Sequence, residues 1–314
     1  MSPSRYRAGA AAGVAILAVV GCRADGESGA RAVQARDELA WRTKVTQERA
    51  DKDREFATSP SSPVAAIERF APTGPAYLAL DGATLRVDDR PGPATQVAFQ
   101  PADGSAWSWQ AAGGELRATA AADGSRALGP GRLSEPTVFR LSERFTAMAQ
   151  IASGAFVITG FDARRKELLE FKQLAYFAPD PRFAVSAKIE RLAAAEPIKL
   201  ATTRGLTKSF VRRATLRFEL DGTPCTLTAF RAAGSTGREL FVPFRDATSG
   251  QQTYGAARFL DLDEPDGGTS TLTLDFNEAY NPLCAYSPAW NCPIPPPENV
   301  LKVAVTAGER TYAH

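Results

Sequence analysis

From residue 76 onward, apolar residues recur at every second position in short runs that Gly, Pro, Asn and Asp separate. This alternation is typical of strands that bury one face. Two of the first runs, 76–80 and 84–87, flank an Asp-Gly pair, which is a strong signal for a tight hairpin turn. Long helical periods are absent after residue 56, which argues against a parallel α/β sheet. We therefore expect an all-β fold of mostly antiparallel strands.

The spacing of these runs predicts two β-rich halves, residues 66–175 and 180–314, each a sandwich or a partly closed barrel. The strands expected in the first half are 76–80, 84–87, 96–100, 106–110, 115–120, 137–140, 145–151 and 155–161. Those expected in the second half are 183–192, 198–202, 214–220, 225–231, 239–243, 256–262, 271–276 and 300–305. Residues 162–173 are mixed and charged, and both a short helix and an edge strand stay open there.

One helix is expected before the strands begin. Residues 35–56 contain no Gly or Pro and are dense in charge. Leu39, Trp41, Val45 and Phe56 supply a thin apolar stripe along this segment. Prolines within residues 59–63 should end the helix, because proline interrupts helical hydrogen bonding. Residues 35–64 are therefore interpreted as an N-terminal helix with its cap.

The first 21 residues have the order of a secretory signal peptide: a basic flank, an apolar run of about a dozen residues and a small residue. Residues 17–22, Leu-Ala-Val-Val-Gly-Cys, resemble the lipobox of bacterial lipoproteins. This resemblance implies cleavage before Cys22, a lipid on its thiol and acylation of the new N-terminus. Residues 22–34 would then be a flexible tether. An ordinary secretory signal that happens to end near a cysteine is the alternative.

The lipobox resemblance also implies an address. Multiple acyl chains such as palmitate hold a protein at a membrane surface without a spanning helix. Arg23, rather than Asp, follows the cysteine, and by the sorting rule of Gram-negative lipoproteins this favours the outer membrane over the inner membrane. We therefore expect a protein of the bacterial cell envelope, attached to the membrane through Cys22, on the periplasmic side or the surface.

Charge and composition exclude several functions. The chain has 37 basic and 35 acidic residues, and loss of the first 21 residues, with Arg5 and Arg7, leaves 35 of each. A neutral chain has no overall field that would steer it onto nucleic acid, so no nucleic-acid partner is expected. The one histidine, His314, excludes a Ser-His-Asp triad and a zinc site built on several histidines. No phosphate-binding glycine motif is present, and no metal or cofactor is expected.

The last quarter of the chain holds the residues that suggest a site. Residues 243–255 place Arg245, Asp246 and Tyr254 between two strand-like runs, and Arg258 follows on the next run. Arg245 suits a ligand carboxylate or phosphate, or else it pairs with a neighbouring acid. Asp246 suits an Asx turn. A buried pair of Arg258 with a carboxylate would be structural.

A second block, residues 275–299, is rich in Tyr, Trp, Asn and Pro, and three consecutive prolines stiffen it. Ordered loops of this length are often functional. The candidate ligand-binding residues of this block are Asp275, Asn277, Tyr280, Asn281, Tyr286, Glu298 and Asn299.

Two hypotheses follow from these candidates. The first is a non-catalytic module that binds a small polar ligand, a peptide or a glycan. The second is a hydrolase or lyase that uses Asp275 and Glu298 as an acid–base pair with Arg245. The first is favoured, because neither block has a recognisable catalytic geometry.

Cys284 and Cys292 enclose a short loop, and in an oxidising envelope a bridge between them would stabilise the fold by about 2–3 kcal/mol. Cys225 is then left over as a buried strand residue. A Cys-x-x-Cys redox motif is absent.

The motifs of the last quarter resemble the bacterial domain-of-unknown-function family numbered 1684. The segments that carry this resemblance are 243–250, 253–255, 258–260, 274–277, 280–282, 284–287, 292–299 and 307–309, with weaker support from 41–42, 62–63 and 176–183. The resemblance implies a β-rich domain and assigns no activity. It also favours a reduced, buried pair for Cys284 and Cys292 over a disulfide.

Overall fold

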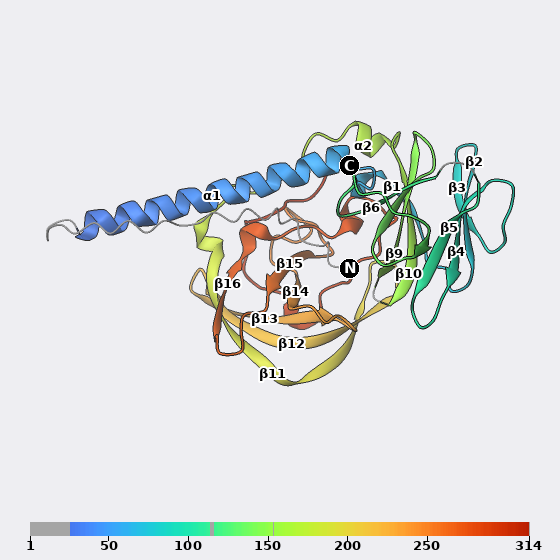
Figure 1. Cartoon of the computed structure of the whole chain (residues 1–314). Coiled ribbons are helices and arrows are strands. Elements are labelled where there is room, and N and C mark those ends of the chain that lie inside the picture. Colours follow the sequence, from blue (N-terminus) through green and yellow to red (C-terminus); the bar gives the residue numbers. More distant parts are fainter. Residues whose placement is uncertain (1–25, 114–115, 153, 314) are drawn as a thin grey trace, which may run out of the picture.

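The computed structural model describes residues 26–113, 116–152 and 154–313. Antiparallel sheets dominate it, and one long helix precedes them (Figure 1), which confirms the expected fold class. The predicted signal peptide and the predicted lipid attachment at Cys22 lie outside the described residues. No helix in the described part of the chain is long and apolar enough to cross a membrane.

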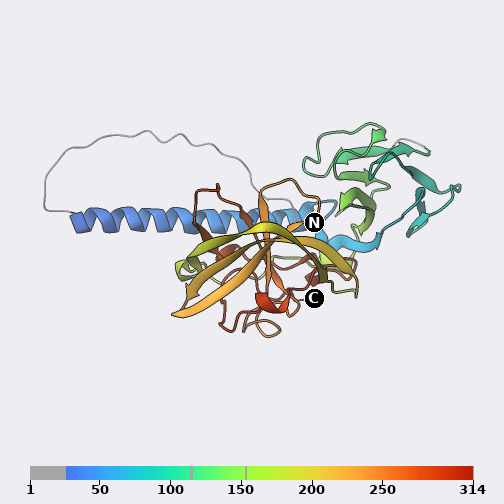
Figure 2. The same cartoon turned by 90° about the horizontal axis from the view of Figure 1, so that it is seen from below.

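Helix α1 runs from Gly26 to Thr58. It ends where the sequence predicts, just before Pro60, but it begins inside the range expected to be a flexible tether. Residues 36–40 are exposed, and contact with the body begins at Trp41. Figures 1 and 2 both show the N-terminal part of α1 extending beyond the second half.

The first half is a sandwich of two five-stranded sheets, with strand orders β1-β10-β9-β8-β6 and β3-β2-β4-β5-β7. The strands of the first sheet are β1 (Ala66–Phe70), β6 (Arg117–Ala120), β8 (Thr137–Arg140), β9 (Phe145–Ala152) and β10 (Ala155–Asp162). Those of the second are β2 (Ala76–Asp81), β3 (Thr84–Asp88), β4 (Thr95–Pro101), β5 (Trp107–Ala111) and β7 (Gly131–Arg132). Neither β1 nor β7 was predicted. The other eight strands match the alternation in the sequence.

The core of the sandwich consists of side chains that both sheets direct inward. Trp107 stacks on Phe156 with ring centroids 4.0 Å apart, and Phe99 and Trp109 contact Phe139 edge-on. These residues occupy alternate positions of their strands, as burial of one sheet face requires.

The second half is one six-stranded sheet with the order β15-β14-β13-β12-β11-β16. Its strands are β11 (Ala184–Ala201), β12 (Thr207–Leu220), β13 (Thr223–Ala232), β14 (Glu239–Phe244), β15 (Arg258–Asp263) and β16 (Thr271–Asp275). Figure 1 shows β11 and β12 arching beneath the coil that follows β16, with α1 on the opposite side of that coil. The two strands predicted at 183–192 and 198–202 are one long strand, whose register shifts between Arg191 and Glu196.

The predicted strand at 300–305 is wrong. Val300 forms a single parallel bridge with Arg245, and the chain then continues as irregular coil. The carbonyl of Val305 accepts a hydrogen bond from the Arg258 guanidinium at 2.8 Å, and the carbonyl of Ala307 accepts another. Leu301 and Val303 still bond the backbone of Arg245 and Ala247, but the Val305 N–H donates to the Asp246 carboxylate at 3.2 Å, so the backbone pairing ends there. Residues 162–173, which were left open, contain the short helix α2 (Lys166–Leu169).

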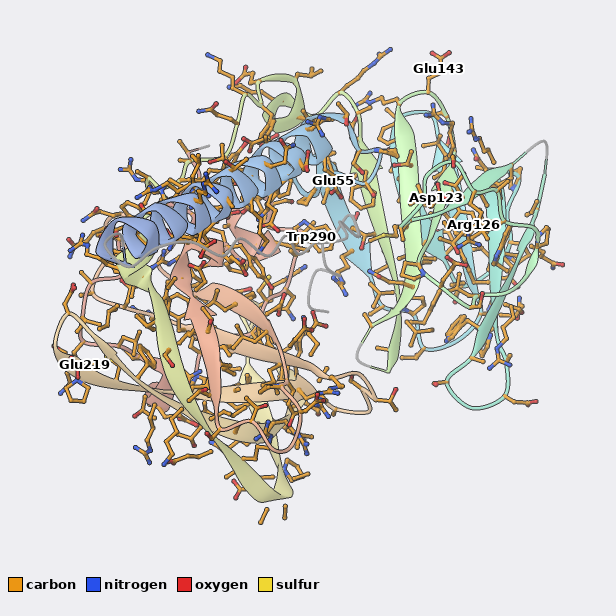
Figure 3. The ribbon with its side chains drawn as sticks, turned by 60° about the vertical axis from the view of Figure 1, so that its left-hand side comes forward. Glu55, Asp123, Arg126, Glu143, Glu219 and Trp290 are labelled. Atoms are coloured by element: carbon orange, nitrogen blue, oxygen red, sulfur yellow. The ribbon has the colours of Figure 1, made fainter. Side chains whose placement is uncertain are left out.

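The two halves share an apolar cluster. Ala66 and Phe161 of the first half pack with Phe210, Phe241 and Trp290 of the second. Figure 3 shows Trp290 between the two halves, and its indole nitrogen donates to the carbonyl of Pro63 at 3.2 Å. The halves are therefore in direct contact through buried side chains as well as through the chain.

Candidate functional site

A cavity of about 200 Å³ lies between α1 and the coil that follows β16. Five separate parts of the chain form its wall: one face of α1, the coil around residues 277–283, and the single residues Tyr176, Asp261 and Glu309. The lining residues are Val45, Glu48, Arg49, Lys52, Phe56, Tyr176, Asp261, Asn277, Glu278, Ala279, Tyr280, Asn281, Leu283 and Glu309.

Helical periodicity explains the α1 wall. The lining residues Val45, Glu48, Arg49, Lys52 and Phe56 are spaced by three or four positions, so they fall on one face of the helix. The two ends of this set, Val45 and Phe56, are buried and pack against the body. The charged side chains between them line the cavity.

Polar contacts attach α1 to the second half. The Trp41 indole nitrogen donates to Asp275 at 2.8 Å. The Arg49 guanidinium donates to the carbonyls of Phe177, at 2.7 Å, and Asn277, at 3.1 Å. Burial lowers the pKa of Arg49, while the nearby Tyr176 and acidic groups oppose this shift. These contacts place a guanidinium on the wall whose Nε has no hydrogen-bond partner among the described residues.

Glu309 is the buried acid of the wall, with only 1% of its surface exposed. Its carboxylate pairs with the Lys52 ammonium of α1. It also accepts hydrogen bonds from the Asn281 backbone N–H, at 2.8 Å, and from the Tyr286 hydroxyl, at 2.5 Å. A buried carboxylate needs partners of this kind, and here they join α1 to the coil.

Aromatic rings complete the wall beside these charges. The Arg49 guanidinium lies over the Tyr176 ring at 4.6 Å, and the Lys52 ammonium lies over the Tyr280 ring at 5.1 Å. The Tyr280 hydroxyl donates to Asp261 at 2.6 Å. The Tyr176 hydroxyl is buried and has no hydrogen-bond partner among the described residues. Burial raises the pKa of Tyr176, so this hydroxyl stays neutral at physiological pH.

Three of the predicted site residues line the cavity: Asn277, Tyr280 and Asn281. Tyr286 lies directly behind the wall through its bond to Glu309. Asn277 also has a structural task, because its amide nitrogen donates to Asp275 and to the carbonyl of Asp180, both at 2.8 Å. Asp275 accepts from this amide and from Trp41, and so it supports the wall rather than forming part of it.

Arg258 and Asp246 form a buried ion pair away from the cavity. The Arg258 guanidinium donates to the Asp246 carboxylate at 2.7 Å, and these side chains are 1% and 0% exposed. Asp246 also accepts from the backbone and hydroxyl of Thr248, which is the Asx turn that the sequence predicts. Burial lowers the pKa of Arg258. This pair holds the last coil in place.

The other predicted residues are dispersed. Asn299 is buried and bonds the backbone of Thr228 and Pro243. Glu298 is exposed and pairs with Arg212 at 2.7 Å, and Tyr254 donates to the carbonyl of Cys284 at 3.4 Å.

Arg245 is exposed. No hydrogen bond or ion pair in the described part of the chain joins Asp275, Glu298 and Arg245. The Arg245 backbone pairs with Asn299 and Val300 beside Glu298, but the Glu298 carboxylate bonds Arg212, and Asp275 bonds Trp41 and Asn277.

Sequence reasoning missed Arg49, Lys52, Tyr176 and Glu309, which are central to the wall. Their signal was present, since the α1 residues follow helical spacing and the other two fall within segments that resemble the family. They were missed because they lie outside the last-quarter loops or beyond the final proline-rich segment. Only the fold brings segments more than a hundred residues apart into contact.

The cysteines in the described ranges are free thiols, and the backbone N–H of Cys284 donates to the sulfur of Cys292 at 3.3 Å. In the same ranges, no group of three or more His, Cys, Asp and Glu side chains could hold a metal ion.

Fold and cavity together define a β-rich domain built on a curved sheet, with a cavity closed by a helix from outside that sheet. The family described as "Protein of unknown function (DUF1684)" matches residues 169–310. Residues 169–310 therefore form a domain of that family, hereafter the family domain, as the sequence motifs indicated. Helix α1 and all strands of the first half lie outside the match.

Solved structures are also similar to this chain. A solution NMR structure of an uncharacterised protein from Haloarcula marismortui is 48% identical, over 45% of this chain and 78% of that chain, with a TM-score of 0.39. No curated protein matches this chain.

Proposed function

We propose that this chain is a lipid-anchored protein of the bacterial cell envelope that binds a small polar ligand in the cavity between α1 and the family domain. The observation that carries the proposal is the convergence of charged and aromatic side chains from five separate segments on one cavity. Convergent polar groups in a mostly apolar hollow are typical of small-molecule sites.

The size of the cavity favours a small molecule over a peptide or a glycan. A cavity of about 200 Å³ accommodates a ligand of a few heavy atoms to the size of an amino acid. Peptides and glycans are commonly held in long grooves or at sheet edges. Of the three ligand classes considered from the sequence, the small polar ligand fits best.

The charges of the wall favour a ligand that carries both a positive and a negative group. Arg49 offers a guanidinium whose bonds go to carbonyl oxygens and whose Nε has no hydrogen-bond partner among the described residues, so a ligand carboxylate would accept from it. Asp261 offers a carboxylate on the same wall, which suits an ammonium group. The rings of Phe56 and Tyr280 suit an apolar portion. Zwitterionic amino acids have this combination.

Membrane attachment is supported by the order of the N-terminal residues and by the helix that follows them. Cys22 precedes α1 by only a few residues, and a helix of 33 residues is about 50 Å long at 1.5 Å per residue. Because residues 36–40 are exposed, this part of α1 would act as a spacer between the membrane and the body. The outer membrane stays the favoured address, on the basis of Arg23.

Ligand binding is tested by thermal unfolding of the Cys22→Ser chain with each of the twenty L-amino acids and with glucose at millimolar concentration. At least one amino acid should raise Tm in proportion to the logarithm of its concentration. In Tyr176→Phe, Tm without ligand should be unchanged, because the lost hydroxyl has no partner, but the shift should fall. Equal shifts in both proteins, or no shift with any probe, would reject the site.

Lipid attachment is tested separately by metabolic labelling with radioactive palmitate in a Gram-negative host. The wild-type chain should incorporate label and sediment with membranes, whereas Cys22→Ser should do neither. A labelled Cys22→Ser chain, or an unlabelled wild-type chain, would contradict the anchor and leave the ligand proposal intact.

A further inference from the structure

Two free thiols lie side by side in the coil of the family domain, outside the cavity wall. Cys284 is in the short 3₁₀ helix Leu283–Ala285, and its backbone N–H donates to the sulfur of Cys292 at 3.3 Å. The Cys292 segment is held to the β11–β12 turn, since Cys292 and Thr203 exchange hydrogen bonds of 2.9 and 3.2 Å. Both thiols are therefore positioned by backbone contacts.

The two sulfurs have different surroundings. Cys284 is partly exposed, whereas Cys292 is buried with 7% exposed. Three donors point at the Cys284 sulfur: the Cys292 thiol, the Tyr254 hydroxyl at 3.7 Å and the Thr203 hydroxyl. Hydrogen bonding, first of all from Cys292, lowers the pKa of Cys284 to about 7. The same bond and burial raise the pKa of Cys292 well above its ordinary value.

Two cations lie near the pair, and both are within range of Cys292. Lys208 lies within electrostatic range of both sulfurs, and Arg69 lies within range of Cys292. The Lys208 ammonium is fixed by a 2.7 Å hydrogen bond to the carbonyl of Asn291, between the two cysteines. Nearby cations and donors stabilise a thiolate, which is the reactive form of cysteine. Its three donors and partial exposure therefore give Cys284 the surroundings of a nucleophile. For Cys292, burial and the bond to Cys284 outweigh the attraction of Lys208, so this thiol is the protonated partner.

Cys225 shows what an inert cysteine looks like in the same chain. It is buried in strand β13, in the core of the second half, in a different apolar cluster from Cys292. Burial raises the pKa of Cys225. It serves as an internal control for thiol reactivity.

We propose that Cys284 and Cys292 are a reversible dithiol–disulfide pair that reduces hydroperoxides, with Cys284 as the attacking sulfur and Cys292 as the resolving sulfur. The Cys284 thiolate attacks one peroxide oxygen, so an S–O bond forms and the O–O bond breaks. The leaving oxygen takes a proton and departs as an alcohol or water. Cys292 then attacks the sulfenic sulfur, an S–S bond forms, and the hydroxyl leaves as water.

The balance of this reaction is two thiols and one hydroperoxide giving one disulfide, one alcohol and one water. Two electrons move from the thiols to the peroxide. A dithiol reductant restores the pair by thiol–disulfide exchange. The peroxide and the reductant are therefore the two co-reactants, and no metal takes part.

The test uses the Cys22→Ser chain, in which Cys225, Cys284 and Cys292 are the only cysteines. One equivalent of hydrogen peroxide should lower the intact mass by two hydrogens, and peptide mapping should find a 284–292 bridge that dithiothreitol reverses. Adding Cys292→Ser should trap Cys284 as a dimedone adduct. Adding Cys284→Ser should slow thiol loss by at least about tenfold, whereas Cys225→Ser should leave the rate unchanged.

The Cys22→Ser chain, in which Cys225, Cys284 and Cys292 are all present, already decides the outcome. The test therefore does not depend on the folding of the further cysteine variants. Thiol loss without a 284–292 bridge, or oxidation of Cys284 no faster than of Cys225, would overturn the proposal. Absence of a dimedone adduct in a Cys292→Ser chain with wild-type Tm would overturn the order of attack.

Discussion

At the scale of single residues, Gly308 carries a strong backbone constraint. Its φ of +74° is in the left-handed region, and a Cβ built there would lie 2.5 Å from the carbonyl oxygen of Ala279 and 2.7 Å from that of Phe276. Glycine is required here both by conformation and by space. It lets the chain pass close to the coil that forms the cavity wall, next to Glu309.

Gly308→Ala should therefore lower the free energy of unfolding by about 3 kcal/mol or more, combining backbone strain and overlap. Gly205→Ala is the matched control, because its φ is +72° but no atom lies within 4 Å of the added Cβ. It should cost only about 1 kcal/mol. Urea unfolding of both variants measures the difference, and equal losses would refute the close approach at Gly308.

Glu55 is a residue-scale case of stability that depends on pH. It lies in the last turn of α1 (Figure 3), and burial raises its pKa to about 7, against the attraction of Lys52. Because the folded pKa lies above the unfolded one, the stabilising effect of protonated Glu55 is complete below about pH 4.5. It is lost as pH rises through about 7.

Glu55→Gln should remove this dependence. At pH 8 the variant should be more stable than wild type by about 1 kcal/mol, a value reduced for the partial exposure of Glu55. At pH 4 the two should be equal. Denaturation midpoints from pH 4 to pH 8 measure the effect, and a constant difference across this range would contradict the raised pKa.

At the scale of elements, α1 has two functional parts. Residues 36–40 are exposed, while the residues from Trp41 to Phe56 hold the helix against the family domain and form one wall of the cavity. The apolar stripe and the prolines predicted the helix and its end. The contact of α1 with the family domain could not be predicted from the sequence, because the partners of Trp41 and Arg49 lie more than a hundred residues away along the chain.

A proline placed in each part of α1 should distinguish the roles of the two parts. Gln47→Pro changes an exposed residue in the part from Trp41 to Phe56 that contacts the family domain. This substitution should cost about 3 kcal/mol of helix stability and abolish the ligand-induced Tm shift. Arg36→Pro changes an exposed residue among those that do not contact the body, so it should interrupt the helix there but leave the Tm of the body and the ligand-induced shift unchanged. Thermal unfolding of both variants, with and without the amino acid that raises the Tm of the parent chain, measures these effects. Binding that survives Gln47→Pro would show that α1 is not a wall of the site.

The alternation of apolar residues located most strands of the first half, but it failed at β1 and at residues 300–305. Alternation located β2 to β5 and β8 to β10 to within a few residues, because each buries one face. Residues 300–305 alternate in the same way, but their backbone pairing with residues 245–247 ends at Val303, because Asp246 and Arg258 bond the backbone of Val305. Strand β1 was missed because it is short and follows a proline-rich cap. It also pairs with β10, from Phe70 opposite Ile158 to Ala66 opposite Phe161, which is far away along the chain.

At the scale of the whole molecule, the two β halves are joined by one apolar cluster rather than by a flexible linker alone. Trp290 and Phe161 lie in that cluster, and the Ser287 hydroxyl donates to the carbonyl of Ala66 at 2.7 Å across the same contact. Burial of such side chains couples the stability of both halves. The sequence left open whether the halves share a core, because no local pattern records a contact between distant strands.

Scanning calorimetry of the Cys22→Ser chain should therefore show one transition, with a van't Hoff enthalpy close to the calorimetric enthalpy. Trp290→Ala should lower Tm and separate the unfolding of the halves, because it empties the centre of the shared cluster. Two resolved transitions in the parent chain would show that the halves unfold independently.

If the space between α1 and the family domain is a ligand site, a crystal structure of the Cys22→Ser chain will show it when the crystal is soaked in the amino acid that gives the largest Tm shift. We expect density for that amino acid among Arg49, Tyr176 and Tyr280, with its carboxylate on the guanidinium. Density elsewhere on the protein, or a cavity filled by side chains of α1, would contradict it.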